Sequence, residues 1–337
     1  MFDKLCLFAH FDQDDLVADY VIYYLEAIRA VGFEIVVIST SRLSMEDVFR
    51  LQSVAHDVLL RENKGHDFAS WALGIERYAE LVSGQLMIAN DSVYGPIGDL
   101  NRTLERLTSI PADFYGMIES AEIAPHLQSW LIVFEPAAHF SAAFRTLFRQ
   151  DFYKMSKIEI IRNGEIGLSQ SLLSHGFRMR SIFNGQFKNG ENLKIPSNFS
   201  HFLWQEIIEF EDIPFLKVEL LRVNPSRITS LDTWKDVVMG RSPDLVPMIE
   251  NHLARTSIGR QNNALPIRDL SIFRNKLQHY IKHDYTHASA GHTILVRLNL
   301  LYFWLQRLWP AILRRSSYLT SCIRISIINI FSKKIKK

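Results

Sequence analysis

Residues 4–41, KLCLFAHFDQDDLVADYVIYYLEAIRAVGFEIVVISTS, combine two apolar runs with a helical pattern between them. The first run continues through Ala9, and apolar residues then recur at helical spacing from about Asp14 to Ala30. Gly32 ends the helical pattern before the second apolar run, Ile35–Ile38. This order predicts a strand, a helix and a second strand, which is the repeating unit of parallel sheets.

The same alternation continues along the next part of the chain. The pattern predicts a second helix near 45–53, a strand at 56–61, a third helix over 67–82 and, once Gly84 stops that helix, a strand at 85–90. Strands that alternate with helices of this length predict an α/β fold with a mostly parallel sheet and helices on both faces. Ligands of such sheets gather beyond the carboxyl ends of the strands.

The chain after residue 110 is less regular. Strands are expected at 112–120, 126–136 and 178–183, and helices at 137–152 and from Glu165 onward. Short helices are expected after about residue 195, and residues 255–292 resemble a linker with an unattached helix.

The composition is that of a globular protein. The chain has 337 residues, of which 47% are hydrophobic and 22% charged, so it is long enough for one large domain or two modest ones. Its two cysteines, Cys6 and Cys322, lie near opposite ends and do not support a disulfide framework, which favours a reducing, cytosolic environment. The first residues are strand-like and lack a basic region before a long apolar stretch, so we expect no signal peptide.

Positive charge is concentrated in residues 293–337. This tail contains nine Lys and Arg residues and no Asp or Glu, and because the whole chain carries +2, residues 1–292 carry −7. Cations interrupt its apolar sequence and Pro310 divides it, so it lacks the run of about 20 apolar residues that crosses a membrane. The pattern predicts a basic, amphipathic helical extension that lies on an anionic membrane surface. The alternative is a helical appendage that packs on its own domain or in an oligomer.

Polar residues gather where the predicted parallel strands end, at 9–12, 39–41, 61–67 and 90–94. In the third of these segments, Asn63 can both donate and accept hydrogen bonds, and Gly65 would allow a ligand to approach the backbone closely. Asp67 could bind a sugar or a base. The same three residue types are typical of an ordinary strand-to-helix turn with an Asp cap, and this alternative stays open.

Two further carboxylates are candidates for chemistry. Asp91 follows an apolar strand and could hold a divalent cation against a diphosphate, although Ser92 stands where a second carboxylate would be preferred. A polar turn is the alternative for Asp91. Glu165, at the expected start of a helix, could take a proton from an acceptor hydroxyl, or could interact only with the positive end of the helix dipole.

Several common kinds of site lack their sequence motifs. The twelve histidines form no pair at metal-ligand spacing and no cysteine cluster exists, so a zinc site is not expected. The sequence contains no Gly-x-Ser-x-Gly, no P-loop and no Gly-x-Gly-x-x-Gly after the first strand. Hydrolase, NTPase and dinucleotide-binding functions therefore lack their main support.

Six segments of the chain, in this order, resemble the rhamnan synthesis F family. They are RENKGHDFASW, LMIANDSVYGPI, DFYGMIES, HLQSWLIVF, NGEIGLSQSLLSHGF and PSNFSHFLWQEII…PFLKVELLRVNP. The resemblance covers roughly residues 3–240, and NKGHDF together with NDSVYGP is its more specific part. It implies a GT-A-like glycosyltransferase with a Rossmann-type sheet that acts in the assembly of bacterial rhamnan, O-antigen or capsule.

The resemblance also implies a division of the chain. Residues 1–240 would form the glycosyltransferase domain, with 1–110 as its nucleotide-sugar-binding half and 111–240 as its acceptor half. Residues 241–292 would then be a linker with helices, and the basic amphipathic tail would follow.

Site residues are implied by their positions in the matching segments. Nine residues are expected to bind the donor. Six lie in the matching segments, namely Arg61, Asn63, Gly65, Asp67, Asn90 and Ser92, and His10, Phe11 and Ser39 lie at the ends of the first two predicted strands. Asn90, Asp91 and Ser92 occupy the place of the Asp-x-Asp signature, so Asp91 is the candidate ligand of a Mg²⁺ or Mn²⁺ ion. Because the signature is incomplete, the requirement for a metal stays open.

The second half of the implied site holds the acceptor and the base. His126, Gln128 and Ser129 are expected to face the sugar or the acceptor. Glu165 lies where inverting GT-A enzymes carry the catalytic base, although the common Glu-Asp pair is Gly-Glu here.

The implied reaction is a single displacement on a dTDP-rhamnose-like donor, with a lipid-linked glycan as acceptor. Glu165 would deprotonate the acceptor hydroxyl, and Asp91 would help to manage the departing diphosphate. Such a protein would be cytoplasmic and peripheral, on the inner face of the bacterial plasma membrane. The main alternative is a non-catalytic sugar- or nucleotide-binding module of a polysaccharide assembly complex. Nucleic-acid binding is not expected, since only the basic, aromatic tail favours it.

Overall fold

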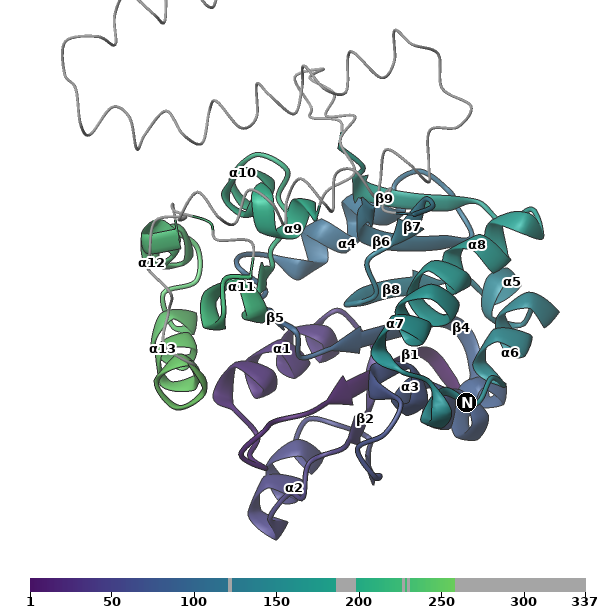
Figure 1. Cartoon of the computed structure of the whole chain (residues 1–337), viewed down its shortest axis with the longest axis horizontal. Coiled ribbons are helices and arrows are strands. Elements are labelled where there is room, and N and C mark those ends of the chain that lie inside the picture. Colours follow the sequence, from purple (N-terminus) through teal and green to yellow (C-terminus); the bar gives the residue numbers. More distant parts are fainter. Residues whose placement is uncertain (121–122, 186–197, 226–227, 229–230, 258–337) are drawn as a thin grey trace, which may run out of the picture. The chain divides into compact units, whose positions relative to one another are not determined.

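Four parallel strands form the N-terminal part of the fold (Figure 1). They are β1 (Phe2–His10), β2 (Glu34–Ser39), β3 (Asp57–Leu60) and β4 (Val82–Asn90). Three helices connect them: α1 (Asp19–Ala30), α2 (Met45–Gln52) and α3 (His66–Tyr78), the last continued by a 3₁₀ turn over Ala79–Leu81. The structure is a computed structural model, and it describes residues 1–120, 123–185, 198–225, 228 and 231–257.

The register of these strands aligns their carboxyl ends. β1 lies between β2 and β4, with His10 opposite Ser39 and Ala9 opposite Asn90. β3 pairs with the outer edge of β2, with Leu60 opposite Ser39. The loops that follow the four strands therefore leave the sheet at one common edge, which we call the carboxyl edge.

Four more strands complete an eight-stranded sheet of mixed direction. They are β6 (Phe114–Ser120), β7 (His126–Leu127), β8 (Leu131–Phe134) and β9 (Met179–Phe183). The strand order is β3-β2-β1-β4-β8-β6-β7, and β9 pairs with β6. Four of the seven pairings are parallel, while β8 runs antiparallel to both β4 and β6, and β7 antiparallel to β6. This agrees with the predicted α/β fold and its mostly parallel sheet.

The remaining described helices are between four and twelve residues long. The helices after β4 are α4 (Leu100–Thr108), α5 (Pro136–His139), α6 (Ala142–Phe148), α7 (Lys157–Ile160), α8 (Gly167–Ser174), α9 (Phe199–Phe202), α10 (Trp204–Glu209), α11 (Val218–Arg222), α12 (Trp234–Met239) and α13 (Leu245–Thr256). The 3₁₀ turns are Phe152–Lys154 and Leu231–Thr233. A second, two-stranded antiparallel sheet joins β5 (Val93–Tyr94) to β10 (Leu216–Lys217).

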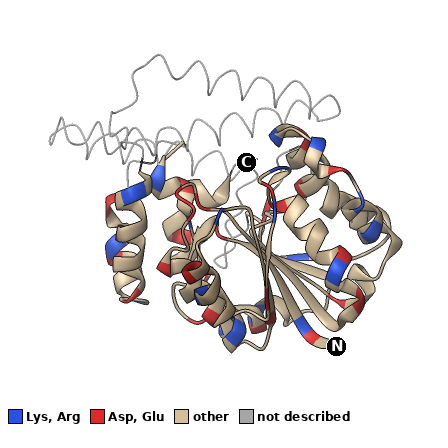
Figure 2. Ribbon diagram, turned by 90° about the horizontal axis from the view of Figure 1, so that it is seen from below, with Lys and Arg blue, Asp and Glu red and all other residues tan. Residues whose placement is uncertain are grey.

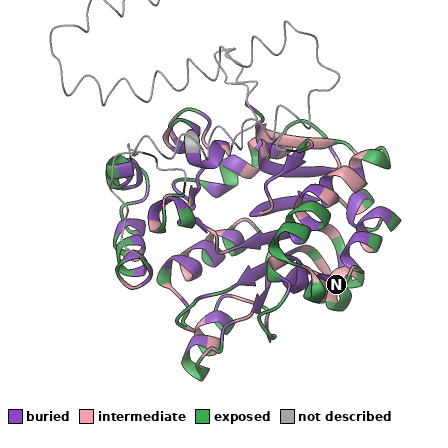
Figure 3. Cartoon of the chain, in the orientation of Figure 1, coloured by how far each residue is buried: buried purple, intermediate pink, exposed green. Residues whose placement is uncertain are grey.

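The inner strands of the central sheet are buried on both faces, whereas the outer strands β3 and β9 are partly exposed (Figure 3). Successive residues of β1 alternate between two apolar clusters, since Cys6 and Phe8 belong to one cluster and Leu5 and Leu7 to the other. The first cluster includes residues of α1, α4 and α10–α13, and the second includes residues of α3, α6 and α8. Helices therefore cover both faces of the sheet, as predicted.

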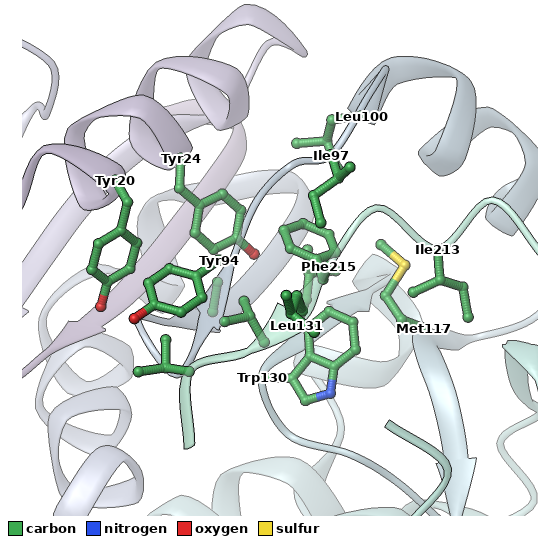
Figure 4. Close-up of a cluster of buried hydrophobic side chains, with 14 of the residues drawn as sticks. Tyr20, Tyr24, Tyr94, Ile97, Leu100, Met117, Trp130, Leu131, Ile213 and Phe215 are labelled. Carbon is green, nitrogen blue, oxygen red and sulfur yellow. The ribbon is translucent and has the colours of Figure 1, made fainter. Parts of the chain in front are cut away.

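A group of aromatic side chains holds the small sheet against α1 (Figure 4). The rings of Tyr20 and Tyr94 meet edge to face at 4.8 Å, and the ring of Phe215 lies 5.0 Å from Tyr24 and 5.1 Å from Trp130. All five side chains are buried. Aromatic pairs in this geometry add to the stabilisation from apolar burial, so the position of β10 relative to the end of β4 is fixed.

The structure corrects three predicted boundaries in the first 110 residues. Helix α1 begins at Asp19 rather than Asp14, because the polar turn before it is longer and contains Asp15 at a positive φ of 59°. The third helix ends at Tyr78. Gly84 lies inside β4 and does not stop a helix. A Cβ atom at Gly84 would overlap the carbonyl oxygen of Asp3, so glycine permits the close pairing of β4 with β1.

Three predictions for the second half were also wrong in detail. The strand expected at 126–136 is divided into β7 and β8, and the helix expected at 137–152 is divided into α5 and α6. The helix expected to open at Glu165 is already formed before that residue. A π-helical segment, Ile161–Ile166, joins α7 to α8 without a break, so Glu165 lies within a helical stretch rather than at a helix N-terminus.

Helix α13 follows the expected domain boundary at residue 240 and packs on the elements before it. Helix α13 packs against α1 and α12, and its residues Leu245, Ile249 and Leu253 belong to the same apolar cluster as the sheet. The linker with its unattached helix, beyond residue 257, and the whole basic tail lie outside the described residues. Among the helices that the structure describes, none has the length and apolar character needed to cross a membrane.

Candidate functional site

Two loops at the carboxyl edge meet through a direct hydrogen bond. Asp67 is the second residue of α3, and its Oδ2 accepts a hydrogen bond of 2.7 Å from Asn90 Nδ2 at the end of β4. Asn90 Oδ1 in turn accepts hydrogen bonds from the Ser92 hydroxyl and the Ser92 backbone N–H, at 2.6 and 3.1 Å. The side chain of Asp67 therefore binds Asn90 at the end of β4 and does not cap its own helix.

Asp91 is bound to the loop after β1. Its Oδ2 accepts a hydrogen bond of 2.7 Å from the Phe11 backbone N–H, and its carbonyl oxygen accepts one of 2.9 Å from the Tyr20 hydroxyl. Burial raises the pKa of Asp91 well above its ordinary value, and the charges of Asp67 and Asp12 raise it further. Burial likewise raises the pKa of Asp67 against the lowering effect of its bond to Asn90. This group of carboxylates favours the approach of a cation.

A lysine from a distant part of the chain reaches the same place. Lys217 follows Leu216 in β10 and lies opposite Val93, and its Nζ is 3.4 Å from Ser92 Oγ and 5.6 Å from the centre of the Trp130 ring. Burial lowers the pKa of Lys217 to about 8, while the charges of Glu165, Glu219 and Asp67 raise it. Sequence motifs did not identify Lys217 as a site residue, although it lies within the family segment PFLKVELLRVNP.

Glu165 lies in the π-helical segment and is bound to the segment between β7 and β8. Its Oε2 accepts hydrogen bonds from the Ser129 hydroxyl and, at 3.3 Å, from the Ser129 backbone N–H. His126 Nε2 lies 3.5 Å from Oε1. Burial alone would raise the pKa of Glu165, but the bonds from His126 and Ser129 and the charge of Lys217 hold it below its ordinary value. The carboxylate is therefore ionised at neutral pH and able to accept a proton.

Gly164 brings the helical stretch of Glu165 close to α3. A Cβ atom at Gly164 would lie 2.9 Å from atoms of the Phe68 ring, closer than ordinary contacts allow. Phe68 directly follows Asp67 in α3. The Gly-Glu pair at 164 and 165 therefore has a steric reason, since glycine lets the helical stretch that carries Glu165 pack on the helix that carries Asp67.

His126 and Gln128 lie beneath Glu165 and Ser129. His126 is 4% exposed and its Nδ1 lies 2.8 Å from the Ala124 carbonyl oxygen. Gln128 donates to Asn198 Oδ1 at 3.1 Å and accepts from the Trp130 indole N–H at 3.0 Å. Both residues are nearly enclosed, so in this structure they position the residues beside them, while Ser129 and Glu165 are partly exposed.

Other predicted donor residues have structural partners at the carboxyl edge. His10 and Ser39, which are 2% and 0% exposed, bind each other through Nδ1 and Oγ at 2.9 Å. Burial lowers the pKa of His10 to about 4, so its imidazole is neutral. These two side chains join the ends of β1 and β2 below the surface.

The loop between β3 and α3 contains both exposed and buried residues. Asn63 is exposed, whereas Gly65 is buried at a positive φ of 76°. A Cβ atom on Gly65 would lie 2.8 Å from the Phe152 carbonyl oxygen, so the close approach expected for a ligand is made by the chain's own backbone. The Arg61 guanidinium lies 5.0 Å from the centre of the exposed Tyr153 ring.

The donor set is poor for an ion held by the protein alone. Within the described residues, no group of three or more His, Cys, Asp and Glu side chains has the geometry to hold a metal ion. Mg²⁺ often uses one or two carboxylates together with substrate phosphates. Asp91 therefore fits such an ion only if the phosphates of a ligand complete its coordination.

Two hollows outlined by described residues do not include these side chains. One, of about 400 Å³, lies between α1 and residues 96–101, and the other, of about 380 Å³, lies between α6 and the helical stretch through 162–175. The candidate site is therefore defined by its converging polar groups at the carboxyl edge.

The fold and this edge define an α/β protein whose predominantly parallel sheet presents charged side chains where its strands end. Residues 35–306 match the family model described as rhamnan synthesis protein F. The chain belongs to this family, which confirms the resemblance drawn from its sequence motifs.

Two relatives cover different shares of the chain. The virulence protein VirA of Vibrio anguillarum is 28% identical over 233 residues, which are 59% of this chain and 74% of that protein. The uncharacterized protein y4gN of Sinorhizobium fredii is 27% identical over 165 residues, 47% of this chain and 43% of its own length.

Two solved structures align with this chain at very low sequence identity. A candidate nucleotide-diphospho-sugar transferase of Desulfovibrio desulfuricans aligns with a TM-score of 0.36 and 6% identity over 77% of this chain and all of its own. A cytidylyltransferase of Leptospira borgpetersenii aligns with a TM-score of 0.34 and 10% identity over 79% of this chain and all of its own. The fold is defined by the strand order and pairing of the chain itself.

Proposed function

We propose that the protein is a glycosyltransferase that moves a sugar from a nucleotide-sugar donor to a growing cell-surface polysaccharide. One observation carries the proposal: an ionised carboxylate, Glu165, and an ammonium group, Lys217, lie with Asp67 and Asp91 at the carboxyl edge of the sheet. This edge is where α/β proteins bind ligands. Membership of the rhamnan synthesis protein F family supports a role in polysaccharide synthesis.

The reaction we propose is a single displacement with inversion. The oxygen of an acceptor hydroxyl forms a bond to the anomeric carbon, and the bond from that carbon to the diphosphate oxygen breaks. The hydroxyl proton passes to Glu165, and the bonding electron pair leaves with the nucleoside diphosphate. Ser129 and His126 hold Glu165 in place through the bonds described above, so that the base is oriented before the acceptor arrives.

The donor half of the site would consist of groups from three loops. Asp67, Asn90 and Ser92 form one hydrogen-bonded chain, and the Phe11 backbone connects Asp91 to the loop after β1. If Mg²⁺ or Mn²⁺ enters with the donor, Asp91 is the residue that would hold it against the diphosphate. We further propose a dTDP-rhamnose-like donor, because the family is described by rhamnan synthesis. We also propose a lipid-linked glycan as the acceptor.

Turnover of the Glu165→Gln variant tests the assignment of the base. General-base catalysis contributes about 10²- to 10⁴-fold, so the variant should lose nearly all sugar transfer while it keeps donor binding. Transfer is measured with the purified full chain, a panel of nucleotide sugars and a lipid-linked acceptor. Near-normal transfer by Glu165→Gln would remove Glu165 from the mechanism.

A non-catalytic sugar- or nucleotide-binding module is the second candidate, and Ser92 in place of a second carboxylate favours it. Such a module would bind the nucleotide sugar but release no nucleoside diphosphate when the acceptor is added. The same transfer assay separates the two functions.

A further inference from the structure

Lys217 is the cation that the fold delivers to the end of β4. The antiparallel pairing of β10 with β5 places Lys217 opposite Val93, and the Val218 backbone N–H donates to the Ser92 carbonyl oxygen at 3.0 Å. These contacts hold the backbone of Lys217 opposite Val93, the residue that directly follows the Asn90–Ser92 segment. The buried aromatic cluster of Figure 4 stabilises the paired strands β5 and β10, because Phe215 directly precedes β10 and packs on Trp130.

The ammonium group is directed at the position where the carboxylate signature is incomplete. Nζ of Lys217 lies 3.4 Å from the hydroxyl of Ser92, the residue that takes the place of a second carboxylate. It also lies over the Trp130 ring, a contact that favours the charged form. The chain thus has a fixed positive charge where a metal-dependent site would have a second ligand for its metal.

Lys217 forms no close ion pair with another described residue. Glu165 and Asp67 influence it electrostatically, but among the ion pairs that the described residues form within 4 Å, none includes Lys217. A cation that is partly buried, lacks a direct carboxylate partner in the described structure and lies among polar groups is well suited to an anionic ligand.

We propose that the Lys217 ammonium group binds the diphosphate of the donor and offsets the negative charge that develops on it during transfer, in place of a divalent cation held by the protein. This inference rests on the proposed glycosyltransferase function. The bond that breaks joins the anomeric carbon to a diphosphate oxygen, and its electron pair stays on that oxygen. Lys217 stays protonated throughout and forms hydrogen bonds to the departing nucleoside diphosphate, while the acceptor proton goes to Glu165.

Titration of nucleoside diphosphates into the full chain tests the inference without requiring turnover. dTDP, UDP, GDP and CDP are each titrated by calorimetry in EDTA and again in Mn²⁺. Wild type should bind at least one of them in EDTA. Lys217→Met should weaken that binding about 10- to 100-fold, the range for loss of a charged hydrogen bond, and Lys217→Arg should restore most of it.

Lys235 supplies a matched control. Its Nζ lies 5.8 Å from the centre of the Trp234 ring, an arrangement like that of Lys217 over Trp130, but Lys235 pairs with Glu250 on α13. Lys235→Met should leave nucleoside diphosphate binding unchanged. The unfolding temperature of each variant shows that loss of binding does not reflect loss of folding.

The outcomes separate this inference from the proposed function. Binding by wild type only in Mn²⁺, or equal binding in EDTA by wild type and Lys217→Met, would overturn the role of Lys217 and leave the glycosyltransferase assignment intact. Failure of all four diphosphates to bind with or without Mn²⁺ would overturn the donor site itself, and this inference with it.

Discussion

Glu165 and Lys217 have opposite charges and opposite expected roles, and their pKa shifts define a pH window. Glu165 has a pKa below its ordinary value, so it becomes protonated only in acid. Lys217 has a pKa of about 8, since burial outweighs the nearby charges of Glu165, Asp67 and Glu219. The proposed transfer needs Glu165 ionised and Lys217 protonated. Both conditions hold between the two pKa values.

We therefore expect kcat/KM to fall as the pH rises through about 8, because Lys217 then loses its proton. In Lys217→Arg the basic limb should move to higher pH, since arginine stays charged. A pH profile of kcat/KM for the two proteins measures this. An unchanged basic limb in Lys217→Arg would show that another group titrates there.

Asp67, Asn90 and Asp91 could be identified from local sequence patterns, whereas Lys217 could not. Asp67, Asn90 and Asp91 follow strands whose apolar runs are visible in the sequence, so their common edge could be predicted from strand alternation alone. Lys217 lies 125 residues from its partner Ser92. Its position depends on the pairing of two-residue strands, which leave no periodic pattern.

Among the secondary-structure elements, the contact between the π-helical segment and α3 determines the position of Glu165. Gly164→Ala would place a Cβ atom 2.9 Å from the Phe68 ring. Such overpacking typically lowers the free energy of unfolding by about 1–3 kcal/mol. It would also shift Glu165, so both stability and sugar transfer should fall. Urea unfolding and a transfer assay measure the two effects.

Gly240 provides the control for this substitution. A Cβ atom there would lie 3.5 Å from the Asp236 carbonyl oxygen, which is an ordinary contact. Gly240→Ala should therefore change neither property appreciably. If Gly164→Ala were as stable and active as Gly240→Ala, the two helices would not be in the tight contact described.

Helix α13 is joined to the loop after β1 by a partly buried ion pair. Arg255 Nη1 lies 2.7 Å from Asp12 Oδ1 and 2.6 Å from Asp14 Oδ2, and Nη2 also binds Asp12. Burial alone would raise the pKa of Asp12, but Arg255 holds it below its ordinary value of 3.8. The pair's contribution is therefore present above pH 3.8 and is lost as the pH falls below it.

Arg255→Ala should lower the free energy of unfolding by about 2 kcal/mol at pH 7, the range for hydrogen bonds to charged groups. The difference from wild type should shrink below pH 3.8, when Asp12 becomes protonated in wild type. Urea unfolding at both pH values tests this. Lys154→Ala, which removes an exposed pair with Asp151, should have little effect and serves as the comparison.

Element boundaries were less predictable than element order. The sequence predicted β1, α1 and β2 because periodicity changes clearly between them. It did not predict the π-helical segment or the division between β7 and β8. These depend on tertiary contacts such as Gly164 with Phe68 and Gln128 with Asn198, which local patterns do not reveal.

At the scale of the whole molecule, charge is distributed unequally along the chain. The described helices carry both signs interspersed (Figure 2), whereas residues 293–337 contain nine cations and no Asp or Glu. We propose that this tail binds an anionic membrane surface, where each cation contributes on the order of 1 kcal/mol. A lipid-linked acceptor would make such binding useful.

Flotation with liposomes tests the membrane proposal. The full chain should float with liposomes that contain anionic lipid and lose this association at high salt. A chain that ends at Gly291 should remain in the unbound fraction. Equal flotation of the two chains would assign membrane binding to another part of the protein.

The central claim is that groups from the loops after β3 and β4 bind an activated sugar together with Lys217. Thermal unfolding of the full chain with a panel of nucleotide sugars tests this claim most directly, because a ligand of the native state raises its unfolding temperature. We expect a rise with at least one nucleotide sugar. The rise should be retained in Glu165→Gln and lost when Asp67, Asp91 and Lys217 are replaced together by Asn, Asn and Met. An unchanged unfolding temperature with every nucleotide sugar, or an equal rise in the triple variant, would contradict it.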